Sequence, residues 1–266
     1  MATVMETKKA VGSFCWADLA SSDVAKTKDF YTKVLGWQAK DTDMGDGKIY
    51  TIFKSGDADV GGMYLMDKEQ LDTGMRSYWT SYVYVEDADK AAQKAQGLGA
   101  KAYTEVFDVG EMGRMAVLGD PSGASFALWQ DKTGTPTDVT GPGSLCWFEL
   151  ATEDTKTAGK FYQDLFGWEP TETPFPDMKY DMFMMGGAPV GGMMTLPEEA
   201  KKNGAPPHWL IYVAVDDCDK TVTAAKTNGG SVLMPPMEFE GVGRGAVISD
   251  NAGGVIGVIK LNPKSN

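Results

Sequence analysis

The sequence predicts an α+β protein built from two tandem domains, and three observations support this prediction. The stretch GSFCWADLA at 12–20 recurs as GSLCWFELA at 143–151, a shift of 131 positions (143 minus 12). A segment rich in Gly, Pro and Thr separates the two copies, and such composition is typical of a linker. Each copy contains the order strand, helix and three strands twice, which predicts a pair of βαβββ units forming a curved mixed sheet with helices on its outer face.

The repeat extends along most of the chain. Phe30-Tyr31 and Gly36-Trp37 recur at the shift of 131, and Val60-Gly-Gly-Met63 returns as Val190-Gly-Gly-Met193 at a shift of 130 (190 minus 60). Chance does not produce matches at this spacing, so the chain is a tandem duplication. The predicted parts are an N-terminal tail at 1–11, a first domain at 12–130, a linker at 131–142, a second domain at 143–262 and a C-terminal tail at 263–266.

The first copy shows each element in order. An alternating stretch predicts a strand at Ser13–Ala20, and Asp23 is a suitable N-cap for a helix that Gly36 ends. Strands are predicted near Gln38–Lys40, Lys48–Lys54 and Val60–Met66. The second half of the copy repeats this order: a strand at Tyr78–Glu86, a helix at Asp87–Leu98, and strands near Ala100–Phe107, Arg114–Leu118 and Ser125–Gln130.

Composition and charge limit the possible partners. The net charge is −12, and such a surface repels nucleic acid and anionic membranes, so we expect a small-molecule ligand instead. No apolar run is long enough to cross a bilayer and the N-terminus has no apolar core of a signal peptide, which favours the cytoplasm. Three cysteines without a Cys-x-x-Cys pair argue against a disulfide framework. The fused halves favour a monomer with an internal pseudo-dimer, or a weak homodimer.

The repeated motifs resemble a known family. The order Trp-x-Asp/Glu-Leu, Phe-Tyr, Gly-Trp, Val-Gly-Gly-Met and Gly-Arg-x-Ala-Val is similar to the vicinal oxygen chelate superfamily, which includes glyoxalases, bleomycin-resistance proteins and extradiol dioxygenases. In its tandem form the resemblance implies the βαβββ fold described above. It implies much less about chemistry, because this fold supports lyases, transferases, oxygenases and simple binding proteins.

The metal ligands that this resemblance implies are missing from the sequence. Metal-dependent members place His, Gln or Glu on the first and last strands of each unit, and a divalent ion needs several such groups together. One histidine in the whole chain makes the usual set impossible in at least one half. We therefore expect no metal and no cofactor, because the corresponding positions are Trp16, Thr80 and Ala127 in the first copy and Trp147, Leu210 and Gly257 in the second.

Three residues are candidates for acid–base chemistry. Residues two apart on a strand share a face, so Asp18 beside Trp16 and Glu149 beside Trp147 are predicted to point into the clefts. A carboxylate next to an indole is partly desolvated and can accept a proton. The alternative is a solvated carboxylate at a strand end. His208 is a candidate general base, with an exposed loop histidine as the alternative.

Arginines and aromatic residues are candidates for ligand binding. Arg114 and Arg244 occupy matched places and could hold a substrate carboxylate or phosphate. The alternative is an ion pair with Asp18, Glu149 or another acid. Aromatic rings at the predicted cleft walls would stack on flat ligands, although core packing is the alternative; these rings are Trp16, Trp147, Tyr78, Trp79 and Trp209.

Three functions remain open at this point. The first is a protein that binds a small organic metabolite in one or both clefts without a metal, by sequestration or simple acid–base chemistry. The second is a metal-dependent glyoxalase-like lyase or dioxygenase with atypical ligands. The third is a non-catalytic scaffold whose clefts are filled by its own side chains, so whether the chain is an enzyme stays open.

Overall fold

The computed structural model describes residues 9–134, 139–175 and 178–263. Most of the predicted N-terminal tail, four residues of the predicted linker and the last three residues lie outside this range. Among the described helices, none has the length and apolar character that a membrane crossing requires.

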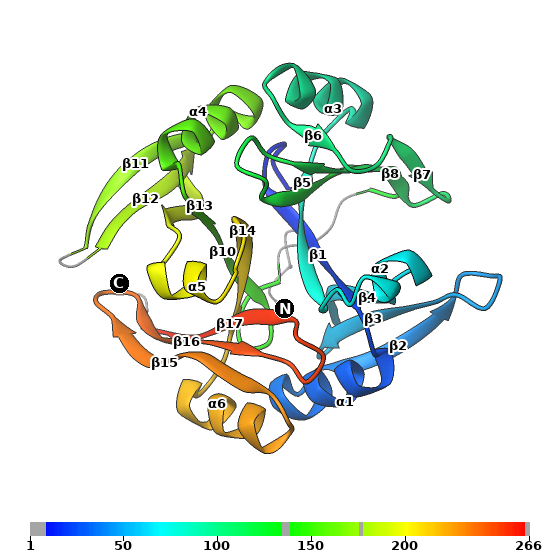
Figure 1. Ribbon diagram of the computed structural model, residues 1–266, viewed down its shortest axis with the longest axis vertical. Helices are drawn as coiled ribbons and strands as arrows, with labels where there is room; N and C mark the ends of the chain where they lie inside the picture. Colours follow the sequence, from blue (N-terminus) through cyan, green and yellow to red (C-terminus); the bar gives the residue numbers. More distant parts are fainter. Residues whose placement is uncertain (1–8, 135–138, 176–177, 264–266) are drawn as a thin grey trace, which may run out of the picture. The chain divides into compact units, whose positions relative to one another are not determined.

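The first repeat forms one mixed sheet, and Figure 1 labels most of its elements. In the described part of the chain its strand order is β2-β3-β4-β1-β5-β9-β8-β6, and β7 also pairs with β8. The elements are β1 (Phe14–Ser21), α1 (Val24–Leu35), β2 (Gln38–Asp43), β3 (Ile49–Ser55), β4 (Ala58–Leu65), α2 (Lys68–Asp72), β5 (Tyr78–Tyr84), α3 (Ala88–Gly97), β6 (Lys101–Ala102), β7 (Phe107–Val109), β8 (Gly113–Gly119) and β9 (Ser125–Asp131).

The second repeat forms a second sheet with the equivalent order, β11-β12-β13-β10-β14-β17-β16-β15. Its elements are β10 (Leu145–Thr152), α4 (Thr155–Phe166), β11 (Glu169–Phe175), β12 (Met178–Met185), β13 (Ala188–Thr195), α5 (Glu198–Lys202), β14 (His208–Ala214), α6 (Cys218–Thr227), β15 (Ser231–Phe239), β16 (Gly243–Ser249) and β17 (Val255–Leu261). The predicted α+β class and tandem arrangement are thus confirmed.

Both sheets are mixed because, in each βαβββ motif, the first strand pairs in parallel with the last. Strand β1 pairs in parallel with β4, and β5 pairs in parallel with β9. The same is true of β10 with β13 and of β14 with β17. The other strand pairs described within each βαβββ motif are antiparallel, such as β2 with β3 and β3 with β4. The sequence predicted the elements, and this register determines which of their side chains face each other.

The helix ends follow the predicted capping chemistry. The side chains of Asp23, Asp87, Asp154 and Asp217 each accept a hydrogen bond from the backbone amide three residues later, at the N-termini of α1, α3, α4 and α6. Helices α1 and α4 both end at a glycine in the left-handed conformation, which other residues adopt only with strain.

Two details differ from the prediction. The strand predicted near Ala100–Phe107 is split into β6 and β7, because the backbone amides of Tyr103 and Thr104 both bond to the carbonyl of Val117 and the Thr104 hydroxyl accepts from the Val117 amide. The short helices α2 and α5 were not predicted. Helix α2 begins with a capping box between Asp67 and Gln70, a signal that the sequence contained.

Residue contacts divide the described chain into two compact units that do not coincide with the sheets. Unit 1 contains 9–16, 81–134 and 147–209, and unit 2 contains 17–80, 139–146 and 210–263. Each unit therefore combines half of one repeat with the complementary half of the other. In unit 1, for example, Phe126 of the first repeat packs against Phe161 and Tyr162 of the second, with ring centroids 6.1 and 5.7 Å apart.

Candidate functional site

The first candidate site is a carboxylate–tyrosine pair in the first repeat. Asp18 on β1 lies opposite Gly62 on β4, and the Tyr50 hydroxyl on β3 donates a hydrogen bond of 2.6 Å to Asp18 Oδ1. Asp18 is only 8% exposed, so this bond acts where water screens it little. A Cβ atom at Gly62 would overlap the Tyr50 hydroxyl, which explains the second glycine of the Val-Gly-Gly-Met motif.

The second repeat contains the matching arrangement. Glu149 on β10 lies opposite Gly192 on β13, and Tyr180 on β12 has its hydroxyl over that glycine. Trp147 Nε1 donates a hydrogen bond of 2.8 Å to the Tyr180 hydroxyl, and this hydroxyl also bonds to the Glu149 side chain. Burial, and then the nearby Glu149 carboxylate, raise the pKa of Tyr180, so the phenol stays neutral and remains a donor.

Both pairs lie on the sheet face that is turned away from helices α1 and α4. Phe53 on β3 packs against Tyr31 of α1, and Phe183 on β12 packs against Tyr162 of α4. Side chains alternate along a strand, so Tyr50 and Tyr180, three residues before these phenylalanines, point to the opposite face. The prediction that Asp18 and Glu149 share a face with a possible ligand is consistent with this geometry.

The surroundings of the two pairs differ in polarity. In the first repeat Tyr64 lies opposite Tyr50, and its hydroxyl bonds to that of Tyr78, which accepts a hydrogen bond of 2.9 Å from Gln70 Nε2. Burial, followed by the charges of Tyr78 and Asp18, raises the pKa of Tyr64. The first repeat thus surrounds its carboxylate with hydroxyl groups.

The second repeat replaces these hydroxyls. Met194 lies opposite Tyr180, where the first repeat has Tyr64, and His208 takes the place of Tyr78 (208 minus 130). His208 is the first residue of β14 and is half-buried. Its Nδ1 lies 2.8 Å from the carbonyl oxygen of Pro206. A thioether and an imidazole therefore stand where the first repeat has two phenols.

Trp79 and Trp209 match the core-packing alternative and not the predicted cleft wall. Trp79 Nε1 donates to the Tyr31 hydroxyl at 3.0 Å, and Trp209 Nε1 donates to the Tyr162 hydroxyl at 2.8 Å. The two indoles are 8% and 5% exposed. They alternate with Tyr78 and His208 along their strands and so face the helices, where they build the core.

Arg114 and Arg244 also lie away from the carboxylate–tyrosine pairs. Arg114 on β8 makes two hydrogen bonds to Asp89 in the first turn of α3, and Arg244 on β16 makes two to Asp219 in the first turn of α6. Ion pairs of 3.2 and 3.3 Å add Asp108 and Glu238. The predicted ion-pair alternative is therefore present, with acids other than Asp18 and Glu149: two lie on helices α3 and α6, and two on strands β7 and β15.

Trp16 lies against an apolar cluster in unit 1 that contains Cys15, Tyr82, Met115 and Ala127. Cys15 itself is buried, and its thiol donates a hydrogen bond of 3.5 Å to the carbonyl oxygen of Tyr82. The pKa of the Cys146 thiol, its counterpart in the second repeat, is raised to about 12 by burial. A thiol with this pKa is a poor nucleophile near neutral pH.

The donor atoms at these faces do not fit a divalent ion. Among the described residues there is no group of three or more His, Cys, Asp or Glu that could hold one. Ala127 is fully buried in the apolar cluster, and a Cβ at Gly257 would overlap the ring of Tyr212. A carboxylate at the position of the late strand ligand would therefore displace packed side chains in both repeats.

Sequence reasoning missed Tyr50 and Tyr180, the two residues that bind the carboxylates. The signal was present, because these tyrosines match at the shift of 130 (180 minus 50). It was not decisive, since tyrosine is common in strands and only the register places its hydroxyl over Gly62 or Gly192.

Comparison with known proteins agrees with this architecture. The chain is 34% identical over 252 residues to "Putative glyoxylase CFP32" of Mycobacterium tuberculosis, covering 94% of this chain and 95% of that protein. It is 35% identical over 270 residues to "Anthracycline biosynthesis protein DnrV" of Streptomyces peucetius, covering 96% and 95%.

The solved structures include similar folds. The Mn(II)-bound glyoxalase from Novosphingobium aromaticivorans superposes with a TM-score of 0.65 at 16% identity, over 94% of this chain and 82% of that one, which shows a shared fold. Residues 13–128 and 144–257 each match the model of one family. The chain therefore belongs to the Glyoxalase/Bleomycin resistance protein/Dioxygenase superfamily, with a family domain in each half.

Proposed function

We propose that this protein binds a small, flat aromatic molecule with hydroxyl groups at its carboxylate–tyrosine pairs, without a divalent ion. The observation that supports this most is the recurrence of the pair: a strand carboxylate, a tyrosine and a glycine that makes room for the phenol occur in both repeats. A Cβ at either glycine would overlap the tyrosine hydroxyl, so the glycine and the tyrosine form one arrangement that both repeats retain.

The ligand class follows from the groups that surround the pair. A carboxylate accepts hydrogen bonds and so favours a ligand with hydroxyl or N–H donors. In the second repeat the half-buried indole of Trp147 and the thioethers of Met182 and Met194 offer apolar and polarisable contact area. The name of the relative from Streptomyces peucetius, an anthracycline biosynthesis protein, agrees with an aromatic ligand.

Calorimetric titration with 1,8-dihydroxyanthraquinone tests the proposal. Hydrogen bonds to charged groups contribute about 1.5–3 kcal/mol, so Glu149→Gln or Asp18→Asn should weaken binding at the altered repeat by about tenfold or more. Glu153→Gln is the matched control, because Glu153 is an exposed carboxylate that pairs with Lys201 at 3.3 Å. Equal affinity for wild type, Asp18→Asn and Glu149→Gln would refute the proposal.

The absorbance of the bound anthraquinone gives a second readout. A nearby carboxylate disfavours a second negative charge, so the bound phenol should keep its proton at a pH where the free probe ionises. The two carboxylate variants should lose this shift while Glu153→Gln keeps it. An upward shift that survives both carboxylate variants would place the probe elsewhere.

The hydroxyl chain of the first repeat favours a second activity there, proton exchange with the ligand. Asp18 would accept a proton from an acidic C–H or O–H group, and the hydrogen-bonded hydroxyls of Tyr64 and Tyr78 with Gln70 would orient the ligand oxygen. Deuterium exchange into acetylacetone, followed by NMR, tests this activity. Asp18→Asn should abolish the catalysed exchange and Tyr78→Phe should slow it, whereas exchange that Asp18→Asn leaves unchanged would refute it.

A further inference from the structure

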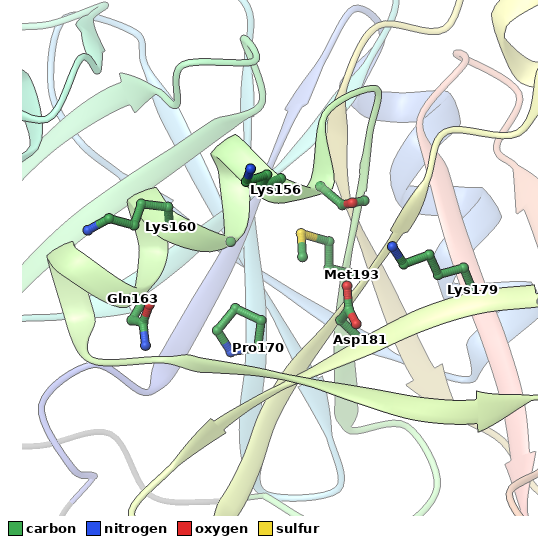
Figure 2. A pocket seen from close by; sticks show the side chains of 9 residues that line it. Lys156, Lys160, Gln163, Pro170, Lys179, Asp181 and Met193 are labelled. Carbon is green, nitrogen blue, oxygen red and sulfur yellow. The ribbon is translucent and has the colours of Figure 1, made fainter.

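The second repeat has a groove on the helix side of its sheet, away from the carboxylate–tyrosine pair. It lies between α4 and strands β11–β13 and has a volume of about 470 Å³ (Figure 2). Its walls include Lys156, Gly159 and Lys160 of α4, Pro170 of β11, and Lys179 and Asp181 of β12. Nothing in the proposed function uses these residues.

The first repeat shows what occupies the corresponding place. Lys28 of α1 extends to β2, where its ammonium group lies 2.6 Å from Asp41 Oδ2. The Thr51 hydroxyl on β3 donates to the same carboxylate at 2.7 Å, and Asp41 lies opposite Thr51 in the strand register. The Lys28 bond is the first cause that lowers the pKa of Asp41, so the carboxylate is held in its charged form.

The second repeat keeps the acid, but a glycine takes the position of Lys28. Lys28 corresponds to Gly159 (28 plus 131), Asp41 to Glu172 (41 plus 131) and Thr51 to Asp181 (51 plus 130). Glu172 and Asp181 are directly opposite each other in the β11–β12 register. Two like charges in this position destabilise a strand pair. A cation bound in the groove would offset this repulsion, as the Lys28 ammonium group offsets the charge of Asp41 in the first repeat.

The residues that line the groove carry a net positive charge. Lys156, Lys160 and Lys179 line it together with Asp181, a lining charge of +2 (three lysines less one aspartate) on a chain of net charge −12. Lys160 is paired with Asp164 of its own helix. Figure 2 shows Lys156 and Lys179 on either side of Met193, with Asp181 below them. The groove therefore offers an acid and separate amines to one ligand.

We propose that this groove binds a small zwitterion of the amino-acid type. Its ammonium group would bind Asp181, beside the place that the Lys28 ammonium has in the first repeat, and its carboxylate would be bound by Lys156 and Lys179. Gly159 makes the space for the ligand, because a side chain there would extend into the groove as Lys28 does. This inference is independent of the aromatic ligand proposed above.

Ligand-observed NMR titration with a set of simple probes tests the inference. Glycine, 4-aminobutyrate and 6-aminohexanoate carry both charges at increasing separation, and butylamine and butyrate carry one charge each. At least one of the three zwitterions should bind saturably and more tightly than both single-charge probes. Butylamine or butyrate binding as tightly as the best zwitterion would overturn the proposal.

Variants assign the binding to the groove. Asp181→Asn should weaken zwitterion binding at least tenfold, and Asp41→Asn, the same change at the acid that Lys28 already occupies, should leave it unchanged. Gly159→Lys copies the first repeat and should abolish binding. Its Cβ would meet Pro170 Cγ at 3.0 Å and Met193 Cε at 3.3 Å, so its folding must be checked by circular dichroism.

The lysine end has its own variant, which does not depend on Gly159. The double variant Lys156→Ala/Lys179→Ala should weaken the binding of the best zwitterion and leave the weaker binding of butylamine unchanged. Zwitterion affinity that is unchanged in both Asp181→Asn and this double variant would overturn the assignment of the groove.

Discussion

Replacing Tyr162 with phenylalanine should destabilise the protein by about 2–5 kcal/mol, because it removes one hydroxyl that forms hydrogen bonds with two buried partners. The Tyr162 hydroxyl accepts from Trp209 Nε1 at 2.8 Å and donates to Asp120 Oδ2 at 3.1 Å. Tyr162 is fully buried and Asp120 is 3% exposed. A buried donor or acceptor left without a partner costs about 1–3 kcal/mol, and more if it is charged. Burial also raises the pKa of Tyr162, so the hydroxyl keeps its proton at all usual pH values.

Urea unfolding followed by far-ultraviolet circular dichroism measures this loss without relying on the fluorescence of Trp209. Tyr103→Phe is the matched control, because Tyr103 is 46% exposed and its change should stay within about 0.5 kcal/mol. A double-mutant cycle with Trp209→Phe should show coupling, since the two side chains share one hydrogen bond. A change of less than about 0.5 kcal/mol for Tyr162→Phe would refute the reasoning that these buried bonds stabilise unit 1.

Three further predictions concern other parts of the chain. Gly97→Ala should stabilise the protein by up to about 1 kcal/mol in the same urea assay, because Gly97 is helical and an added Cβ meets nothing within 4 Å; a loss of stability would contradict this. The pKa values of Asp89 and Asp219 are lowered, first by their hydrogen bonds to Arg114 and Arg244. Their contribution to stability is therefore present above the unfolded pKa of 3.8 and is lost as the pH falls through the lower folded pKa. Asp89→Asn and Asp219→Asn should make the free energy of unfolding depend less on pH in the acid range. An unchanged pH dependence would argue against these ion pairs. Cys146, whose pKa is about 12, should react with iodoacetamide at pH 8 much more slowly in the native than in the urea-unfolded protein, as mass spectrometry of the labelled peptide would show; equal rates would mean that the thiol is accessible.

Local chemistry was readable from the sequence, whereas the choice of sheet face was only partly so. Asp23 and Gly36 delimit α1 as predicted, because caps act over a few residues. Strand alternation and the match between repeats predicted that Asp18 and Glu149 share a face with a ligand; in the structure these carboxylates bond to Tyr50 and Tyr180, and the ligand stays a prediction. Trp79 and Arg114 were expected at the ligand, but alternation alone does not say which of two faces a helix will cover.

The packing partner of each helix depends on residues far along the chain. Tyr162 of α4 meets Asp120, which belongs to the other repeat, and no local pattern in either segment indicates this bond. The groove beside α4 was equally hidden. Its walls combine Gly159 of α4 with Pro170 of β11 and Asp181 of β12, and no local pattern brings these residues together.

The discontinuous make-up of the two compact units has a consequence for the newly made chain on the ribosome. Unit 2 joins 17–80 and 139–146 to 210–263, so 129 residues (210 minus 80, minus 1) are synthesised between its first part and its last. Domains generally fold as units as they emerge, and long closures delay the contacts that reward them. We expect α1 to lack its packing partners until translation is nearly finished, because Phe30 lies close to Gly230 and the Tyr31 side chain bonds to Asp250. Nascent chains halted before residue 210 should therefore be the ones that chaperones hold.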